Sequence, residues 1–356
     1  MNPVWAAMDS GLLSGFRAPL VTGIVALVVT LILTPFVKKL AIKKGAVDDP
    51  KIDDRRVHTE PIPRWGGIAI FGGILVAVVA AMLIEYRDQP FPMYLVGILL
   101  CSAAVVVVGA LDDLHQYKAR IQAGCLLALG LIVQLFVTKT PTGHDISVHI
   151  EGLKIGANWV DLGWWAYPLT AIYIFVVSKT MDTIDGIDGL AAGIAAIAAT
   201  TLSVVATYFV LNYQHIEKSA MLELPRVALI SAAIAGAALG FLRYNYNPAK
   251  IFMGTGGAQV FGFMLAAISI VGVLKTAAAV SLVIPILAFG IPMFDAVFVI
   301  IRRIASRQPI TQADKRHLHH TLLGKGLSQK QAVWVLYIAA IMLCGVIGLV
   351  VSRKHG

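Results

Sequence analysis

Three aspartates, Asp182, Asp185 and Asp188, lie within seven residues of one another between two strongly apolar segments. Charged groups are costly to carry into hydrocarbon, so such a cluster predicts a functional site at a membrane surface. A spacing of three residues places the carboxylates near one face of a helix. Gly186 and Gly189 have no side chain, so backbone or ligand can approach closely there. The alternative interpretation is an acidic polar loop that merely connects two spans.

A second acidic pair, Asp112 and Asp113, ends another apolar segment. Adjacent carboxylates repel each other unless a cation or a proton lies between them. Proteins commonly hold Mg²⁺ through one or two carboxylates together with substrate phosphates, so Mg²⁺ is the ion that we expect here. A coupling-ion site in a transporter is the alternative. Lys118 and Arg120 follow in the same loop, and each could hold a phosphate or anchor the chain at the membrane interface.

Basic residues and glycines come together in the loop of residues 55–67. Arg and Lys suit phosphate recognition. Gly66 and Gly67 open the next apolar segment, where we expect backbone N–H groups to be free for an anion. His58 and Arg64 lie nearest these glycines and are the residues that we assign to a substrate. For the more distant arginines, an ordinary basic loop beside a membrane is an equally good explanation.

Two later loops are also polar. Residues 243–258 are rich in Asn, Gly and aromatic side chains, a composition suited to recognising a base or a sugar. The last loop contains His317, His319 and His320 beside two cations, which indicates a polyanionic ligand. A transition-metal site is the rival interpretation, but the carboxylates elsewhere favour a hard ion with phosphates. An exposed His-rich loop without function is the third.

The composition shows what must position these groups. The chain has 356 residues, of which 58% are hydrophobic and 14% charged. An ordinary soluble domain contains about 25% charged residues. We therefore expect an all-α polytopic membrane protein that forms one integral domain over residues 1–356, with no cleavable signal peptide. The three cysteines lie in apolar segments without metal-like spacing and are interpreted as packing residues.

Ten segments are candidate spans: residues 16–37, 66–84, 93–111, 121–137, 164–178, 188–211, 226–242, 256–274, 278–301 and 332–351. Prolines and a glycine in the ninth, at Pro285, Gly290 and Pro292, predict a bent or broken helix. If the N-terminus is outside, roughly 20 of the 29 Lys and Arg fall in cytoplasmic loops, as the positive-inside rule requires. All the polar motifs then lie on the cytoplasmic face. This asymmetry and anionic lipid explain the net charge of +9 better than nucleic acid does.

One long external loop is predicted at residues 138–163. Polar and apolar residues alternate over 145–150, Glu151 and Gly152 supply a turn, and a second apolar stretch follows. This pattern predicts a small β-hairpin lying on the membrane. We assign it no chemistry, and interpret its two histidines as surface residues rather than metal ligands.

Taken in order, six motifs resemble those of the polyprenyl-phosphate N-acetylhexosamine-1-phosphate transferase family (MraY, WecA and TagO). They are His58-Thr-Glu-Pro-Ile-Pro-Arg-Trp-Gly-Gly67, Asp112-Asp113, Asp185-Gly-Ile-Asp-Gly-Leu190, Asn247-Pro-Ala-Lys-Ile-Phe-Met-Gly254, Pro292-Met-Phe-Asp295 and His317-Leu-His-His320. Each motif is weak alone, but six in order over about residues 20–350 are specific. The interrupted histidine motif is closer to the WecA/TagO branch than to MraY, whose three histidines are contiguous.

The resemblance implies an enzyme of about ten spans in the cytoplasmic membrane, with catalytic loops on the cytoplasmic face. Such enzymes use Mg²⁺, with Mn²⁺ as a possible substitute. They transfer a sugar 1-phosphate from a UDP-N-acetylhexosamine to a polyprenyl phosphate and release UMP. UDP-GlcNAc is the expected donor, and the lipid-linked product would serve cell-envelope polysaccharide synthesis. The partners are these substrates and membrane lipid, with a homodimer possible and no nucleic acid.

The resemblance also implies roles for individual residues. By matching position, Asp112 and Asp113 lie beside the metal and the lipid phosphate, and Asn247 helps to hold the substrate. The nucleotide pocket is lined by Asp185, Gly186 and Asp188, and the diphosphate is contacted by His317, His319 and His320. Catalysis of phosphoryl transfer is mostly positioning and charge neutralisation.

Four positions depart from the family pattern. Thr255 stands where the family has an Asp that is a principal Mg²⁺ ligand, and Ala258 where it has Ser; Lys179 and Asp182 replace two Asn. Because a hydroxyl is a much poorer Mg²⁺ ligand than a carboxylate, we expect Asp182 to compensate as a metal ligand and activity to be retained. The alternatives are a weakened or non-catalytic homologue and a secondary transporter. A transporter would place its site near the bilayer midplane rather than on one face.

Overall fold

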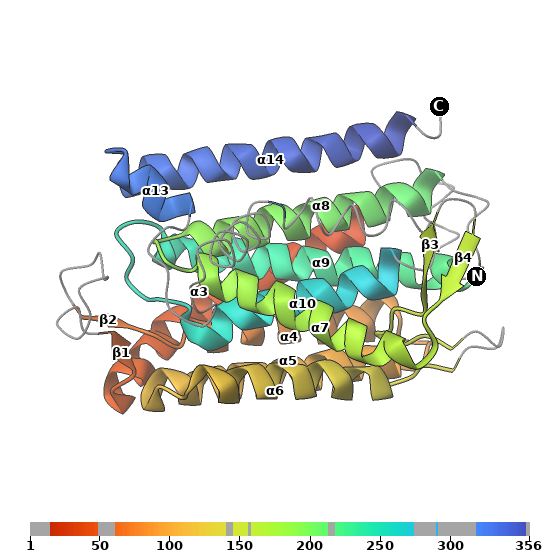
Figure 1. Ribbon diagram of the computed structural model, residues 1–356, viewed down its shortest axis with the longest axis horizontal. Helices are drawn as coiled ribbons and strands as arrows, with labels where there is room; N and C mark the ends of the chain where they lie inside the picture. The colour runs from red at the N-terminus through yellow and green to blue at the C-terminus, as the bar shows by residue number, and fades with distance from the viewer. Residues whose placement is uncertain are drawn as a thin grey trace, which may run out of the picture.

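The computed structural model of the protein describes residues 15–48, 61–139, 145–155, 158–212, 218–273, 290 and 318–353. Most of these residues form ten helices: α3 (Arg17–Lys44), α4 (Gly66–Glu85), α5 (Met93–His115), α6 (Ala119–Ile132), α7 (Ala166–Ile184), α8 (Leu190–Asn212), α9 (Lys218–Asn245), α10 (Gly254–Val273), α13 (Leu318–Gly324) and α14 (Gln329–Arg353). Two small antiparallel sheets, β1 (Val47–Asp48) with β2 (Ile62–Pro63) and β3 (Gly152–Ile155) with β4 (Asn158–Asp161), lie at opposite ends of the bundle (Figure 1).

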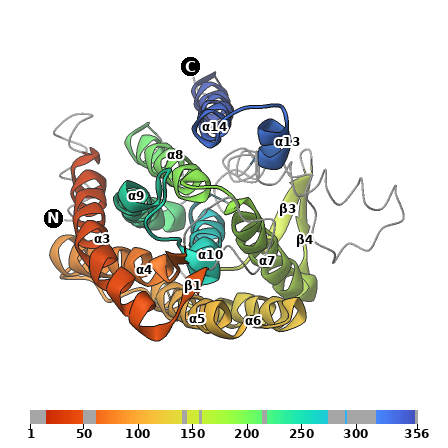
Figure 2. The same ribbon diagram turned by 90° about the vertical axis from the view of Figure 1, so that its left-hand side faces the viewer.

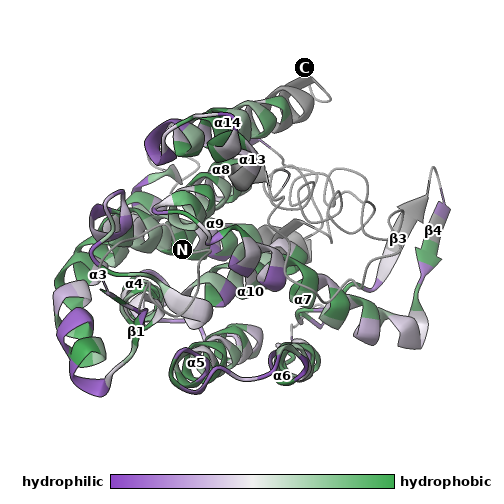
Figure 3. Cartoon of the chain, turned by 60° about the vertical axis from the view of Figure 1, so that its left-hand side comes forward, coloured by the Kyte–Doolittle hydropathy of each residue, from purple (hydrophilic) through white to green (hydrophobic). Residues whose placement is uncertain are grey.

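The helices are apolar over most of their length (Figure 3). Seven of those that the structure describes are long and apolar enough to cross a membrane: α3, α4, α5, α8, α9, α10 and α14. Their outer faces expose large apolar side chains, such as Leu20, Ile32 and Phe36 on α3, which favour contact with lipid. These features confirm an all-α polytopic membrane protein. Helices α6 and α7, which coincide with two further predicted spans, are not among the seven.

Helix α10 lies at the centre of the bundle (Figure 2). It packs against α4, α5, α7, α8 and α9, and its side chains are almost completely buried. Phe261 and Phe263 on α10 are among the largest fully buried side chains, together with Tyr94 on α5 and Phe241 on α9. The central helix therefore fixes the relative positions of its neighbours.

Glycines let the first turn of α10 approach two neighbouring helices at backbone distance. A Cβ added to Gly109 on α5 would lie 2.2 Å from the Cα atom of Gly256, and one added to Gly67 on α4 would lie 2.4 Å from the backbone nitrogen of Gly257. No side chain fits at either contact, so both positions require glycine. The ends of α4, α5 and α10 therefore meet at one place in the structure.

The helix ends that carry the polar motifs lie at one end of the bundle, on the left in Figure 1. This end contains the C-termini of α5, α7 and α9 and the N-termini of α4, α8 and α10. Successive helices run in opposite directions, so loops that alternate along the chain meet there. For the motifs within the described residues, the prediction that they share one face is confirmed.

Each predicted span except the ninth coincides with a described helix, although several boundaries differ. Helix α3 continues through Pro35 to Lys44, well beyond the predicted end at residue 37. It ends at Gly45, whose left-handed φ of 75° lets its N–H reach the carbonyl groups of Ala41 and Ile42. The predicted ninth span, 278–301, lies outside the described residues apart from Gly290.

The hairpin at the other end is built from different residues than predicted. Strands β3 and β4 pair Gly152 with Asp161 and Ile155 with Asn158, so the turn does not lie at Glu151 and Gly152. The stretch 145–150 that was expected to form the first strand instead packs on the bundle, with its alternate side chains Ile146, Val148 and Ile150 buried. Its polar–apolar alternation therefore reflects burial against the helices and not pairing with the next strand.

Candidate active site

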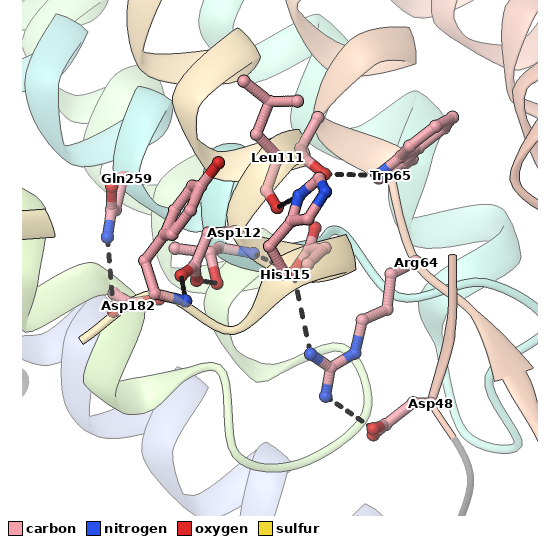
Figure 4. Close-up of polar contacts among 12 residues, drawn as sticks. Asp48, Arg64, Trp65, Leu111, Asp112, His115, Asp182 and Gln259 are labelled. Carbon is pink, nitrogen blue, oxygen red and sulfur yellow. Dashed lines mark hydrogen bonds and ion pairs between the residues drawn. The ribbon is translucent and has the colours of Figure 1, made fainter. Parts of the chain in front are cut away.

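An aspartate cluster occupies the end of the bundle where α4, α5, α7 and α10 converge. We define it as the five aspartates that the loops bring to this end: Asp112 and Asp113 from α5, Asp182 from the last turn of α7, and Asp185 and Asp188 from the turn before α8. Figure 4 shows part of the cluster with the arginine beside it. The structure therefore brings together two acidic motifs that are about 70 residues apart in the sequence.

Asp182, Asp185 and Asp188 do not share one face of a helix, contrary to the prediction. Helix α7 ends at Ile184, so only Asp182 is helical, and the other two lie in the turn that leads to α8. Gly189 has a left-handed φ of 83°, which interrupts the helical path before α8 begins. The three carboxylates consequently have different environments.

Asp112 is held by three hydrogen-bond donors. Its Oδ1 accepts the Tyr117 backbone N–H and the Gln122 side-chain amide, both at 2.9 Å. Its Oδ2 accepts the Thr255 hydroxyl at 3.1 Å. The side chain is buried, and these donors satisfy both of its carboxylate oxygens. Asp112 therefore links α5, α6 and α10.

Asp113 points toward the first turn of α10. Its Oδ1 accepts the Thr255 backbone N–H at 3.2 Å, a position where the helix dipole favours a negative charge. The same oxygen lies 3.6 Å from Nη1 of Arg64, whose Nη2 is paired with Asp48 at 2.5 Å (Figure 4). A Cβ added to Gly254 would lie 2.2 Å from Oδ2, so only glycine leaves room for this carboxylate. The structure thus places Arg64 beside the acidic pair, and its assignment to the substrate stays a prediction.

Trp65 holds Arg64 in this position. Its indole N–H donates at 2.9 Å to the carbonyl of Ala110, two residues before Asp112. Trp65 has a left-handed φ of 84°, an unusual conformation for a bulky residue that a specific contact must hold in place. The indole anchor joins the start of α4 to the end of α5.

Asp182 forms an ion pair with Lys179 one turn earlier on α7. The two charged atoms, Nζ and Oδ2, are 2.5 Å apart. Lys179 also donates to Oε1 of Gln122 at 3.1 Å, and the Gln259 amide donates to Asp182 at 3.5 Å. Gln122 therefore bridges Lys179 to Asp112, and the two residues that replace the expected asparagines are direct partners.

Asp185 is the carboxylate with the fewest protein partners. Within the described part of the chain no group donates a hydrogen bond to its side chain, although part of the side chain is accessible. Burial raises its pKa to about 8, and the nearby charges of Asp182, Asp113 and Asp188 act in the same direction, whereas Arg64 lowers it. This group is available to a cation or a proton.

Asp188 organises the loop that follows α9. Its Oδ2 accepts the Asn247 side-chain amide at 2.9 Å and the Ala249 backbone N–H at 3.0 Å. Asn247 also donates to Gln329 at the start of α14. Asp188 and Asn247, both assigned to the substrate by resemblance, therefore lie together. Gly186 is exposed in the same turn.

Gly189 is fixed by contacts from two further helices. Its N–H donates to Oδ1 of Asn245 at 3.1 Å, and its carbonyl accepts the Tyr337 hydroxyl of α14 at 2.6 Å. Asn245 in turn donates to the Ile251 carbonyl at 3.1 Å. The turn between α7 and α8 is therefore rigidly held, and so are the aspartates that it carries.

The expectation that Gly66 and Gly67 offer free N–H groups to an anion is wrong. These groups donate to the carbonyls of Phe252 and Met253 at 3.0 and 2.8 Å. The two glycines instead serve close packing of α4 against the segment that leads into α10.

The remaining predicted site residues lie at the margin of the described structure or outside it. Lys118 and Arg120 are exposed at the start of α6. His319 and His320 belong to α13, which begins at Leu318. His58 and His317 lie outside the described residues, as does Asp295. Their assignments stay predictions.

The donor chemistry of the cluster fits Mg²⁺. Among the residues that the structure describes, no three His, Cys, Asp or Glu side chains form a ready-made metal site. Mg²⁺ does not need one, because it keeps several waters and commonly takes only one or two carboxylates beside substrate phosphates. Asp185, which accepts no hydrogen bond from the described chain, can supply such an oxygen ligand next to Asp182.

The sequence alone did not indicate several residues that hold the cluster together. Asp48, Gln122, Asn245 and Gln259 all bond to predicted site residues or to their supporting turn. Asn245 lies two residues before the assigned Asn247, so the polar composition of that loop was a usable signal. The other three lie in otherwise unremarkable positions, and only the fold shows their role.

Comparison with known proteins identifies the family of the chain. Residues 95–273 match the family described as Glycosyl transferase family 4. The chain is 37% identical to the probable undecaprenyl-phosphate N-acetylglucosaminyl 1-phosphate transferase of Bacillus subtilis, over 88% of this chain and 80% of that protein. It is 31% identical to the decaprenyl-phosphate N-acetylglucosaminephosphotransferase of Mycobacterium leprae, over 95% and 87% of the two chains. A Salmonella typhi undecaprenyl-phosphate alpha-N-acetylglucosaminyl 1-phosphate transferase is 27% identical, over 89% and 80%.

Proposed function

The chain belongs to glycosyl transferase family 4, and from this we propose that it transfers N-acetylglucosamine 1-phosphate from UDP-GlcNAc to polyprenyl phosphate. The products would be UMP and a lipid-linked sugar diphosphate for cell-envelope polysaccharide synthesis. Relatives named for this transfer, with undecaprenyl or decaprenyl phosphate in their names, support the reaction.

The observation that carries the proposal is the aspartate cluster at one end of an apolar helical bundle. Both substrates carry phosphate, one on a soluble nucleotide and one on a membrane lipid. A site at the end of membrane-spanning helices is accessible to both, whereas a site halfway along them would favour a transported ion. Arg64 and Lys179 lie beside aspartates of the cluster and can balance phosphate charge.

In the proposed reaction an oxygen of the lipid phosphate attacks the β-phosphorus of UDP-GlcNAc. The new bond joins this oxygen to the β-phosphorus, while the bond from the β-phosphorus to the bridging oxygen breaks and UMP leaves with that oxygen. A phosphate monoester is already largely ionised near pH 7, since its second pKa is about 6. The attack therefore does not require a general base, and the protein's main task is to position the two phosphates.

We assign metal binding to the accessible side of the cluster, at Asp182 and Asp185, with Asp112 and Asp113 behind them. Mg²⁺, or Mn²⁺ in its place, would neutralise the charge of the diphosphate when bound. Asp185 must lose its proton to act as a metal ligand. Asp188 accepts a hydrogen bond from Asn247 and holds it beside the turn between α7 and α8. The three donors on Asp112 keep that carboxylate in place as the substrates bind.

We propose that the cluster faces the cytoplasm. Basic residues gather at this end of the described helices, including Lys38, Lys39, Lys43 and Lys44 on α3 and Arg243 on α9. Such an excess is typical of cytoplasmic loops. The test is a single cysteine introduced at exposed Lys250 or at exposed Asp145, at opposite ends of the chain's bundle, followed by labelling of intact cells. Labelling of Lys250→Cys but not Asp145→Cys from outside would contradict this orientation.

The transfer itself is tested with the purified full-length protein in detergent. UDP-GlcNAc, undecaprenyl phosphate and Mg²⁺ are supplied, and both UMP and the lipid product are measured. We expect UMP release that depends on the lipid and falls at least about 100-fold in Asp185→Asn, since oriented charge stabilisation contributes about this much. Asp145→Asn, at the other end of the molecule, is the matched control. A folded protein that releases no UMP from any of a panel of UDP-sugars would refute the transferase assignment.

A further inference from the structure

Lys179 places a positive charge inside the aspartate cluster. Its Nζ atom is 2.5 Å from Oδ2 of Asp182 and 3.1 Å from Oε1 of Gln122. Gln122 in turn donates to Asp112. The ammonium is therefore held at a defined position by α6 and α7 rather than left to move freely in solvent.

This ammonium retains capacity for another partner. A lysine has three N–H donors, and the contacts to Asp182 and Gln122 use two of them. The Lys179 side chain is 39% exposed, whereas that of Asp182 is 18% exposed. The third donor can therefore reach a ligand that enters from the accessible side of the cluster.

The other cations near the cluster are less suited to this task. Arg64 is bound by Asp48 and lies beside Asp113, with only 26% of its side chain exposed. Lys118 and Arg120 are exposed at the start of α6, outside the hydrogen-bond network of the aspartates that the structure describes. A phosphate that approaches five aspartates is repelled by the ionised ones, so it needs a cation close by.

Building on the proposed function, we propose that Lys179 is a phosphate ligand of the active site. A phosphate oxygen of the substrate takes the third N–H and competes with Asp182 for the ammonium. Lys179 thereby acts as a built-in counter-ion at a site where Thr255 supplies a hydroxyl rather than a charge. The same chemistry suits the diphosphate of the nucleotide and the monophosphate of the lipid, so the test separates these two sources.

The test measures binding without metal and without turnover. The full-length protein in phospholipid-free detergent with EDTA is titrated by calorimetry with UDP, UMP and uridine, and separately with undecaprenyl phosphate and undecaprenol. In Lys179→Gln we expect the affinity for a phosphate-bearing ligand to fall by about 10–100-fold, the loss associated with one hydrogen bond to a charged group. Affinities for uridine and undecaprenol should not change.

Asp182→Asn supplies a prediction of opposite sign. If Asp182 competes with phosphate for Lys179, removing its charge should tighten phosphate binding by about 2–5-fold, the range of a partly exposed ion pair. The double variant Lys179→Gln/Asp182→Asn leaves no unpaired acid, and should bind phosphate more weakly than the unmodified protein but no more weakly than Lys179→Gln. Lys179→Arg should restore part of the affinity, and Lys44→Gln, an exposed lysine at the same end, should behave like the unmodified protein.

The outcomes show whether Lys179 binds the nucleotide or the lipid. They also distinguish a failure of this inference from a failure of the proposed transferase function. A loss confined to UDP and UMP assigns Lys179 to the nucleotide, and one confined to undecaprenyl phosphate assigns it to the lipid. Unchanged affinity for all three phosphate ligands in the folded double variant would overturn the proposal and leave Lys179 as a structural partner of Asp182. A protein that binds UDP through Lys179 but releases no UMP would refute the transferase and keep the inference.

Discussion

Replacing Thr255 with aspartate tests whether this site can hold a third carboxylate without a bound cation. The Thr255 hydroxyl is 3.1 Å from Oδ2 of Asp112, and its backbone N–H is 3.2 Å from Oδ1 of Asp113. Thr255→Asp would therefore place a third carboxylate beside two others, where the present side chain donates a hydrogen bond. Without a cation this arrangement is unfavourable, and with Mg²⁺ it becomes favourable.

The size of the effect follows from the distances. Two unit charges about 4 Å apart at an effective dielectric constant of about 20 repel by about 4 kcal/mol. Protonation of the new carboxyl limits the penalty, because raising its pKa from about 4 to about 7 also amounts to about 4 kcal/mol at roughly 1.4 kcal/mol per unit. Mg²⁺ at about 1,000 times its Kd stabilises the folded protein by about 4 kcal/mol, which offsets the penalty.

The assay is thermal unfolding of the purified protein in EDTA and in Mg²⁺, followed by UMP release. In EDTA, Thr255→Asp should lower the Tm by several degrees relative to the unmodified protein, and Mg²⁺ should restore it. Thr255→Ser keeps the hydroxyl donor and should change little. Thr255→Val removes it and should destabilise by about 1–3 kcal/mol with no recovery in Mg²⁺, since the buried Asp112 loses a donor.

Two results would refute this reasoning. Equal unfolding temperatures of Thr255→Asp and the unmodified protein in EDTA would mean that the new carboxylate does not face the acidic pair. The second concerns compensation by Asp182. If the unmodified protein releases no UMP and Thr255→Asp does, Asp182 does not replace the missing carboxylate.

Further expectations concern packing, protonation and the loop after α9. Gly109→Ala should destabilise the protein by about 1–3 kcal/mol and abolish UMP release, because the added Cβ would lie 2.2 Å from the Cα atom of Gly256. Gly124→Ala is the control, since its Cβ would meet nothing within 4 Å. Equal unfolding temperatures of the two variants would contradict the packing argument. Asp185 is protonated below its pKa of about 8, so the apparent Mg²⁺ affinity measured by calorimetry should rise about tenfold per pH unit from pH 6 and level off above pH 8. If the Mg²⁺ affinity of Asp185→Asn has the same dependence on pH, this carboxylate is excluded as the metal ligand that titrates. Asp188→Ala removes the acceptor of two hydrogen bonds and should weaken UDP binding by at least about tenfold with a smaller loss of thermal stability, whereas a purely structural role would change only the stability.

Most of the fold was predictable because a membrane span is determined by the composition of a short continuous segment. About 20 consecutive apolar residues are needed to cross the bilayer, and most backbone hydrogen bonds must then be satisfied inside the helix. The segments that became α4, α5, α8 and α10 meet this condition without reference to the rest of the chain. The hairpin was misplaced because the alternation over residues 145–150 has the same period whether the segment pairs with a strand or packs on a bundle.

Most of the acidic residues of the site were predictable from the sequence, but the hydrogen bonds that hold them were not. Carboxylates at the ends of apolar segments stand out because ionised groups are rare in such places. Asp112, Asp113, Asp185 and Asp188 were identified in this way and lie at one end of the bundle. The interpretation of Gly66 and Gly67 was wrong because the same glycine pattern occurs in anion sites and in close helix packing. The sequence does not show which segment packs against these glycines.

The sequence by itself therefore determined the membrane-spanning helices, the acidic residues at their ends and the family. These are properties of short stretches, set by apolar length and by the penalty for charge in hydrocarbon. Only the tertiary structure decided that Asp112 is saturated with donors, whereas the side chain of Asp185 accepts no hydrogen bond from the residues that the structure describes. The hydrogen bond from Lys179 to Gln122 spans 57 residues and that from Thr255 to Asp112 spans 143, so neither can be read from local pattern. The first contact exists only after α6 has packed against α7, and the second only after α10 has packed against α5.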